Sequence, residues 1–353
     1  IIKRLELIIM AKFVSCNCVE HEVVLDHMNA IRHCSNHNLE FGGRPIIYDY
    51  FDGNNFTKED FFRRKWIHRQ MFRNGQCPST CKNCFHLAEK EWTDDNYIDF
   101  ILLTPWAECN SMCVYCPVCT DENVKKNTKK YDYYSVVKYM MDNDFFIPET
   151  IFDFAGGEPT MYERFDDILE LIFERGYKNV VIHTNGIKYS ETVAKLIHHG
   201  QCKVLTSIDS GNRELYKKIK RVDEFDNVKE TLRKYAAAQC VKPNAMRAKY
   251  ILVPGINDTE EFIVEWLDMC KELGIISVIL NLDFNWIINN TDLAYKQKDM
   301  PRSPENTTMH LYDLIEFTKS EAAKRGIVTS LYGEIFTIKT LVEGEVTLNV
   351  IDD

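Results

Sequence analysis

From about residue 97 onward, apolar runs typical of strands alternate with amphipathic stretches typical of helices, and this alternation constrains the fold more than any other feature. Helical patterns lie near residues 133–143, 162–175, 190–199, 225–238 and 259–273. The six predicted strands are Tyr97–Thr104, Thr150–Ala155, Asn179–Thr184, Lys203–Ile208, Arg247–Val253 and Ile276–Leu282. Serial β/α units predict an α/β fold in which right-handed crossovers curl a parallel sheet into a partial (β/α)6 TIM-like barrel. The chemistry of such folds gathers at the C-terminal ends of the strands.

The segments on either side of this alternation predict two further parts. Residues 1–95 are rich in cysteine, histidine and aromatic residues, which predicts a small cysteine-rich N-terminal domain organised by a metal. Residues 96–288 are then the barrel core, and residues 289–353 complete or cover the barrel. The last part contains a polar loop, a helix and a strand or hairpin, expected at Asn289–Asn306, Thr308–Arg325 and Ile335–Val350.

Composition limits the cellular setting and the partners. The chain has 353 residues, of which 45% are hydrophobic and 27% charged, so it can bury a sizeable core. A net charge of −10 argues against nucleic acid as a partner, because binding phosphates requires excess Lys and Arg. No apolar run has the length needed to cross a bilayer, and the first 13 residues lack a signal-peptide cleavage site. We therefore expect a cytoplasmic protein with no membrane partner.

The thirteen cysteines are strongly clustered, with ten of them before residue 120. In a cytoplasmic chain, clustered cysteines are more often metal or redox ligands than disulfides. Cys202, Cys240 and Cys270 stand alone and are expected to be small buried hydrophobic residues.

One cluster, Cys109, Cys113 and Cys116, has the spacing C-x3-C-x2-C and follows the first predicted strand. Three thiolates on one short loop can hold three corners of a 4Fe-4S cluster and leave its fourth iron open. Zinc is the alternative, because structural zinc takes four ligands and Cys119 offers a fourth.

This spacing, with Tyr115 in the aromatic position before the last cysteine, resembles the signature of the radical S-adenosylmethionine (SAM) superfamily. The resemblance implies that the open iron of a 4Fe-4S cluster chelates SAM. Reductive cleavage then yields a 5′-deoxyadenosyl radical that removes a hydrogen atom from the substrate. It also implies an electron donor such as flavodoxin or ferredoxin. No residue is assigned a catalytic role.

Further motifs at the ends of the later strands support the resemblance. The sequence from Phe154 to Thr160, FAGGEPT, looks like the family's glycine-rich motif, whose backbone and acidic side chain receive the SAM amine. Polar residues after the third and fourth strands are similar to those that contact SAM, and the segment after the fifth resembles one that lies against the adenine. Ordinary turn chemistry is the alternative for the residues after the third and fourth strands. The cofactor-binding residues implied in this way are Tyr115, Gly156, Gly157, Glu158, Pro159, Asn185, Ser207, Asp209, Pro254 and Gly255.

The N-terminal cysteines repeat the C-x3-C-x2-C spacing at Cys77, Cys81 and Cys84, but no GGEP framework follows them. Together with upstream cysteines they resemble the layout of SPASM or twitch domains, which hold an auxiliary 4Fe-4S cluster. Such domains usually follow the barrel, whereas here the cysteines precede it. The resemblance implies a ligand set of Cys18 (or Cys16), Cys34, Cys81 and Cys84, with zinc as the alternative metal.

The sequence constrains the identity of the substrate less than it constrains the fold or the cofactors. Enzymes with SPASM-like clusters often modify peptides or carbohydrates, which implies a peptide or a small polar substrate. Polar residues near the sixth strand suit such a substrate, because they are expected to face the barrel mouth; they are Asn281, Asp283, Asn285 and Trp286. A non-enzymatic alternative is a non-catalytic Fe–S or zinc-binding protein built on a degenerate barrel.

Overall fold

The computed structural model describes residues 12–26, 30–34, 46–48, 56–78, 81, 84, 86–104, 108–116, 132–283 and 305–331. The chain forms two compact units, which are treated separately below. Unit 1 comprises residues 1–105 and 129–152, and unit 2 comprises residues 106–128 and 153–353.

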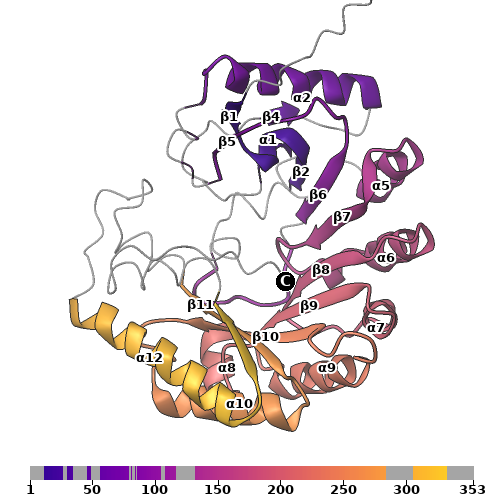
Figure 1. The fold of residues 1–353 in the computed structure, drawn as a ribbon. Helices are drawn as coiled ribbons and strands as arrows, with labels where there is room; N and C mark the ends of the chain where they lie inside the picture. Colours follow the sequence, from indigo (N-terminus) through magenta and orange to yellow (C-terminus); the bar gives the residue numbers. More distant parts are fainter. Residues whose placement is uncertain are drawn as a thin grey trace, which may run out of the picture. The chain divides into compact units, whose positions relative to one another are not determined.

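Unit 2 is built on parallel strands connected by helices (Figure 1). The pairs β8–β9, β9–β10, β10–β11 and β11–β12 are all parallel, so the C-terminal ends of these strands meet at one edge. The strands are β8 (Asn179–Thr184), β9 (Cys202–Ser207), β10 (Met246–Leu252), β11 (Ser277–Leu282) and β12 (Val328–Leu331). Strands β10 and β11 are almost wholly buried, which is typical of parallel strands covered on both faces.

The helices of unit 2 begin at clear capping signals. The side chains of Ser190, Asn212 and Thr259 each accept a hydrogen bond from the backbone N–H three residues further on, which satisfies an otherwise unpaired donor. Helices α6, α7, α9 and α10 lie along one side of the strands (Figure 1). The helical elements are η2 (Pro159–Met161), α6 (Phe165–Glu174), α7 (Glu191–His198), α8 (Arg213–Lys220), α9 (Phe225–Ala237), α10 (Glu260–Glu272) and α12 (Glu305–Lys324).

In its described residues, unit 1 combines a small sheet with the helices α1, α2 and α5. Strand β2 pairs in parallel with β6, and β3 and β4 continue on the other side of β2 in antiparallel pairs. Strands β1 and β5 form a separate antiparallel pair. The elements are β1 (Phe13–Ser15), α1 (Asn17–His21), β2 (Glu22–Asp26), β3 (Ile31–Arg32), β4 (Ile46–Tyr48), α2 (Lys58–Arg73), β5 (Ala88–Lys90), β6 (Ile98–Thr104) and α5 (Tyr133–Asp142). Strand β7 (Phe146–Phe154) begins in unit 1 and ends in unit 2.

The six strands and five helices expected between residues 97 and 283 are all present, which confirms the α/β class and the series of β/α units. The helix expected at Thr308–Arg325 is also present as α12. The elements before residue 97, including α2, were not predicted, nor were α8 and β12. Helix α2 was not predicted because its buried side carries two charged residues among the apolar ones, which interrupts the regular spacing of apolar residues. The buried residues are Phe61, Phe62, Lys65, Arg69 and Phe72.

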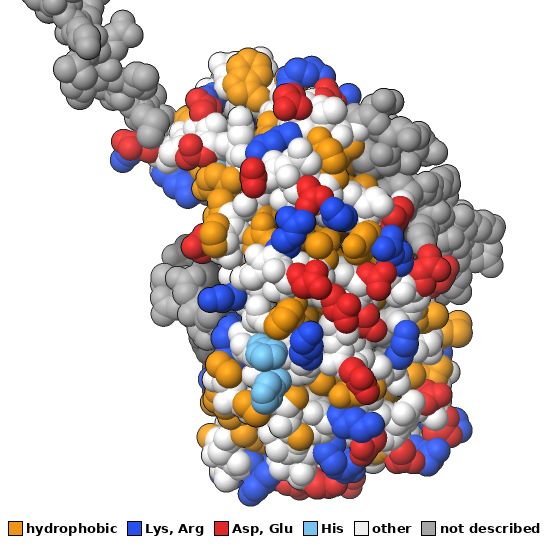
Figure 2. Space-filling model, turned by 90° about the vertical axis from the view of Figure 1, so that its right-hand side faces the viewer, with side chains coloured by type: hydrophobic (Ala, Val, Ile, Leu, Met, Phe, Trp, Pro, Cys, Tyr) orange, Lys and Arg blue, Asp and Glu red, His pale blue; other side chains and the backbone are white. Residues whose placement is uncertain are grey.

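The domain limits expected at residues 95 and 288 stay a prediction. Cys119, Asn285, Trp286, most of the polar loop Asn289–Asn306 and the tail at Ile335–Val350 lie outside the described residues. No helix in the described part of the chain is long and apolar enough to cross a membrane. On the face drawn in Figure 2, basic and acidic side chains are interspersed, as is usual for solvent-facing helix surfaces.

Candidate active site

The loop that carries the first cysteine cluster is anchored to the C-terminal end of helix α8. The backbone amides of Met112 and Val114 donate to the carbonyl oxygens of Lys220 and Ile219, both at 3.0 Å. The last carbonyls of a helix have no partner within the helix, so these two bonds cap α8 and hold the loop at the same time. We call residues 108–116 the cluster loop.

Side chains of the cluster loop alternate between the interior and the surface. Ser111 and Cys113 are buried, whereas Met112 between them is 48% exposed. Cys109 and Cys116 are half-buried, and the backbone amide of Cys116 donates to the carbonyl of Cys113 at 3.1 Å. The loop thus directs Cys113 inward and leaves the other two cysteines partly accessible.

The donor set fits an iron–sulfur cluster. Three soft thiols within eight residues suit a cubane, in which each cysteine binds a different iron. Within the described ranges, no three Cys, His, Asp or Glu side chains converge closely enough to hold a single metal ion. A cubane does not require that convergence, because its ligands are spread over separate corners.

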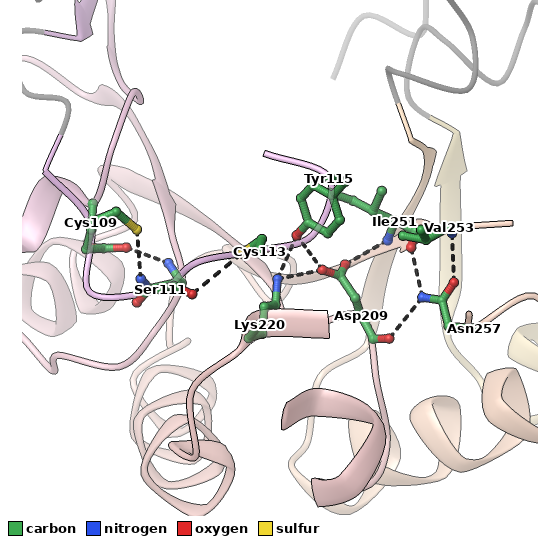
Figure 3. Close-up of polar contacts among 11 residues, drawn as sticks. Cys109, Ser111, Cys113, Tyr115, Asp209, Lys220, Ile251, Val253 and Asn257 are labelled. Atoms are coloured by element: carbon green, nitrogen blue, oxygen red, sulfur yellow. Dashed lines mark hydrogen bonds and ion pairs between the residues drawn. The ribbon is translucent and has the colours of Figure 1, made fainter. Parts of the chain in front are cut away.

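A buried ion pair lies directly behind Cys113 (Figure 3). The Nζ atom of Lys220 is 2.5 Å from Oδ2 of Asp209, and the two side chains are 1% and 0% exposed. The Tyr115 hydroxyl donates to the same Oδ2 at 2.5 Å and accepts from Lys220 Nζ at 2.7 Å. Residues from the cluster loop, from the turn after β9 and from the end of α8 therefore meet at one point.

The electrostatics of this group favour a charged lysine. Burial opposes the charge of Lys220, but the neighbouring Asp209 and Cys113 together hold its pKa above the ordinary value. Burial and the negative charge of Asp209 raise the pKa of the Tyr115 hydroxyl well above its usual range, so Tyr115 stays neutral. An ammonium group is thus held next to the cysteine that is most deeply placed.

Asp209 is enclosed by protein contacts. Its Oδ1 atom accepts from the backbone amide of Ile251 at 2.7 Å, and its carbonyl oxygen accepts from Asn257 Nδ2 at 3.1 Å. Asn257 also bonds the backbone of Ile251 and Val253, which closes the end of β10. Asp209 itself adopts a left-handed backbone with φ +59°, which Asp tolerates better than most residues. Its carboxylate acts here as a brace between loops.

Glu158 joins the ends of β7 and β8. Its Oε1 atom accepts from the Thr160 amide at 3.2 Å and from the hydroxyls of Thr160 and Thr184, both at 2.7 Å. Its Oε2 atom accepts from the backbone amide of Asn185 at 2.7 Å. Glu158 is 1% exposed, and burial raises the pKa of its carboxyl although these hydrogen bonds oppose the shift.

Asn185 connects this brace to the cluster loop. Its Nδ2 atom donates to Asn110 Oδ1 at 2.6 Å and lies 3.7 Å from the sulfur of Cys109. The backbone amide of Glu158 donates to the carbonyl of Glu108 at 2.8 Å. Two separate contacts therefore tie the strand ends to the start of the cluster loop.

The other expected residues also lie at strand ends. Gly156 is exposed with φ +103°, a conformation that L-residues rarely adopt, and Pro159 opens η2. Ser207 is half-buried at the end of β9. Pro254 is half-buried in the turn after β10, and Gly255 is exposed there with φ +79°. Asn281 is buried at the end of β11.

Sequence reasoning missed Lys220 and the structural role of Asn257. A signal for Lys220 was available, because it falls on the buried side of α8 with Leu215, Tyr216 and Ile219. A lysine on the apolar side of a short helix requires a partner, since an unpaired buried charge is costly. Without the fold, nothing in the sequence names that partner as Asp209.

Comparison with known proteins decides the family. Residues 103–269 match the sequence model of the Radical SAM superfamily. The chain contains a radical SAM domain. This confirms the assignment to the superfamily of radical SAM enzymes that the cysteine motif predicted.

Curated relatives match about half of the chain. "Probable GTP 3',8-cyclase" of Saccharolobus islandicus is 26% identical over 172 residues, which cover 49% of this chain and 53% of the relative. "GTP 3',8-cyclase" of Aliarcobacter butzleri is 26% identical over 185 residues, which cover 51% of this chain and 54% of the relative. The chain thus spans about half the length of the curated relatives it matches.

Solved structures share the fold. The crystal structure of Streptococcus suis SuiB bound to S-adenosylmethionine has a TM-score of 0.51 at 15% identity, covering 83% of this chain and 60% of SuiB. SuiB bound to its precursor peptide SuiA also gives 0.51, at 13% identity, covering 95% and 77%. At such identities the likeness concerns the fold alone.

Outside the radical SAM domain, unit 1 gathers five cysteines in one packed cluster. Cys16, Cys18, Val19 and Phe72 form its buried part, and Cys34, Cys77, Cys81 and Leu87 pack against them. The side chain of Cys18 hydrogen-bonds with those of Cys16 and Cys34, which together with burial raises the pKa of the Cys18 thiol. Three of the four predicted ligands, Cys18, Cys34 and Cys81, are thus brought together, and Cys84 follows in a turn after Cys81.

Buried basic side chains lie close to this cysteine cluster. Arg69 pairs with Glu20, and both side chains are fully buried. Lys65 is also fully buried, and its Nζ donates to the carbonyl of Glu22 at 2.8 Å and lies 3.2 Å from His33 Nδ1. Burial lowers the pKa of Lys65 to about 7, while Cys18 is among the groups that oppose this shift.

Proposed function

We propose that the chain binds a 4Fe-4S cluster through Cys109, Cys113 and Cys116 and uses it to cleave S-adenosylmethionine reductively. The observation that carries the proposal is the cluster loop, which three independent elements hold beside the strand ends of a radical SAM domain. When bound, the cluster supplies the electron for cleavage, and the resulting 5′-deoxyadenosyl radical removes a hydrogen atom from the substrate.

The chain's own residues orient the cofactors. Glu158 has one hydrogen bond on Oε2 and three on Oε1, so Oε2 retains capacity for the ammonium group of SAM. Gly156 and Gly157 let the backbone approach that ligand without a Cβ in the way. Ser207, Pro254 and Gly255 are proposed to contact the nucleoside part of SAM from the ends of β9 and β10.

The decisive experiment is anaerobic reconstitution with iron and sulfide, followed by dithionite and SAM. We expect 5′-deoxyadenosine from the wild type and none from Cys113→Ser. Cys240→Ser is the matched control, because Cys240 is exposed and far along the chain from the motif. A wild type fully loaded with iron that yields no 5′-deoxyadenosine would indicate the alternative, a non-catalytic Fe–S or zinc-binding protein.

We propose that the cysteines of unit 1 hold a second 4Fe-4S cluster, with Cys18 (or Cys16), Cys34, Cys81 and Cys84 as ligands. A cubane with four thiolates carries a net negative charge, which the buried Lys65 nearby would offset. The packing of Cys16, Cys18, Cys34 and Cys81 supports this SPASM-like assignment. Zinc is the alternative, and metal analysis of the isolated protein separates the two.

For the substrate we propose a peptide or a carbohydrate, with flavodoxin or ferredoxin as the electron donor in the cytoplasm. The fold shared with SuiB, which was solved with a precursor peptide, supports a peptide. A second candidate is GTP, because the curated relatives carry the name GTP 3',8-cyclase. Incubation of the reconstituted protein with GTP and SAM separates the candidates. A cyclised nucleotide detected by mass spectrometry supports GTP, and its absence beside 5′-deoxyadenosine formation excludes it.

A further inference from the structure

The buried pair formed by Lys220 and Asp209 lies between the cluster loop and the ends of two strands. Lys220 contacts the loop twice, through its backbone carbonyl to Met112 and through its ammonium to the Tyr115 hydroxyl. Asp209 reaches the other way, to the backbone of Ile251 in β10. A rigid bridge therefore runs from β10 through Asp209 and Lys220 to the loop (Figure 3).

The Lys220 ammonium contacts Asp209 and Tyr115, and Cys113 lies close to it (Figure 3). In Figure 3 the side chain of Lys220 lies between Cys113 and Asp209, and the negative charges of both groups favour its ammonium form. Asp209 lies in the turn after β9 and accepts a hydrogen bond from the backbone amide of Ile251. Cys113, by contrast, is one of the proposed cluster ligands. The ammonium of Lys220 is therefore the member of the pair drawn toward Cys113, with the carboxylate of Asp209 on its other side (Figure 3).

The stability of the fold does not by itself require a buried charge pair of this kind. Apolar or neutral residues of similar volume often replace such a pair without loss, because desolvation cancels much of the attraction. The position of the pair, with one end on the cluster loop, indicates a role in holding and tuning that loop. This role differs from SAM binding, because it concerns how the two side chains hold the cluster loop.

We propose that Lys220 is a positioning residue that clamps the cluster loop and places a positive charge beside Cys113. This inference rests on the proposed function, because it assumes that Cys113 ligates the 4Fe-4S cluster. Reduction adds an electron to the cluster, and a nearby cation stabilises the more negative form. Lys220 therefore raises the reduction potential of the cluster and makes the first electron transfer easier.

The test uses the double variant Lys220→Met/Asp209→Asn, which removes both charges and keeps the volume of each side chain. Lys217→Met is the matched control, because Lys217 lies on the same helix but is 57% exposed and paired with Asp223. In the metal-free protein, the hydrogen-exchange rates of the amides in residues 108–116 measure how firmly Lys220 holds the loop, without any cofactor. In the reconstituted protein, a redox titration followed by EPR measures the effect of the Lys220 charge on the reduction potential.

We expect roughly tenfold faster exchange of the loop amides in the double variant, since a charge-assisted contact to the loop is lost. We also expect a lower reduction potential for its cluster, while Lys217→Met matches the wild type in both measurements. Wild-type exchange together with a wild-type potential would overturn the proposal. If the double variant fails to fold, Tyr115→Phe removes only the linking hydroxyl, and unchanged exchange there overturns the clamp.

The two proposals fail in different ways. If the wild type binds no cluster, the proposed function fails, while the exchange experiment on metal-free protein still reports on the clamp. If the wild type binds and reduces its cluster but the double variant behaves identically, the proposed function stands and the role of Lys220 is wrong.

Discussion

The Oε2 atom of Glu158 accepts a hydrogen bond from the backbone amide of Asn185 at 2.7 Å, which joins the loop after β7 to the residue after β8. Both residues were expected to contact SAM, and neither motif by itself indicates that they touch. The same Asn185 reaches the cluster loop through Asn110. Glu158 therefore organises the site as well as offering an acceptor to the cofactor.

Glu158→Gln is expected to weaken this arrangement. All four protein partners of the carboxylate are donors, so the NH2 group of glutamine faces at least one donor and leaves it unpaired. We expect a loss of about 1–3 kcal/mol in the free energy of unfolding, together with weaker SAM binding by equilibrium dialysis. Glu163→Gln, on the exposed surface nearby, is the control. Equal stability of the two variants would contradict the bracing role.

We expect each of the two cysteine groups to hold about half of the iron that the wild type binds. A fully loaded wild type should contain about eight irons per chain, and Cys34→Ser should contain about four, with the SAM-dependent EPR change retained. Cys113→Ser should also lose about four irons, but with loss of that EPR change. About four irons in the wild type, with one equivalent of zinc, would identify a zinc site in unit 1.

The stability of the metal-free protein is expected to depend on pH through Lys65. Burial lowers the pKa of Lys65 to about 7 in the folded state, whereas the unfolded chain has the ordinary lysine value near 10.5. Between these values only the unfolded state binds the proton, so the free energy of unfolding rises with pH in this window and is flat below it. The full range corresponds to a few kcal/mol.

Lys65→Met isolates this effect, because the variant lacks the titrating group. The stability advantage of the variant over the wild type should be largest at about pH 7 and should shrink toward pH 10, as measured by urea denaturation. Losing the hydrogen bond to Glu22 lowers the variant's stability by an amount that does not change with pH. A difference that is constant across the window would show that Lys65 keeps its charge when buried.

Gly211→Ala is expected to destabilise unit 2. A Cβ at this position would lie 2.2 Å from the carbonyl carbon of Glu265 and 2.3 Å from the amide nitrogen of Trp266, both in the backbone of α10. Backbone cannot move aside easily, so we expect a loss of about 3 kcal/mol in thermal or urea unfolding. Gly274→Ala is the comparison, since a Cβ there meets no atom within 4 Å and only its φ of +75° is strained. Equal losses would argue against close packing at Gly211.

The reason for a glycine at position 211 could not be seen in its own segment of the sequence. Gly211 lies in the polar segment at the end of β9, where turn chemistry was the alternative to cofactor contact by Ser207 and Asp209. In the structure the glycine has a different role, because its lack of a side chain lets α10 approach. Close approach between segments more than fifty residues apart leaves no periodic signal in the sequence.

The sequence by itself determined the order of the six strands and five helices expected between residues 97 and 283, the radical SAM assignment and the positions of the motif residues. These follow from local rules: apolar period, capping residues and cysteine spacing act within a few residues of one another. Only the tertiary structure paired Lys220 with Asp209, joined Glu158 to Asn185 and packed Cys18 against Cys34. Those partners are brought together by strand pairing and helix docking, and the free energy of a buried contact depends on neighbours that are distant along the chain.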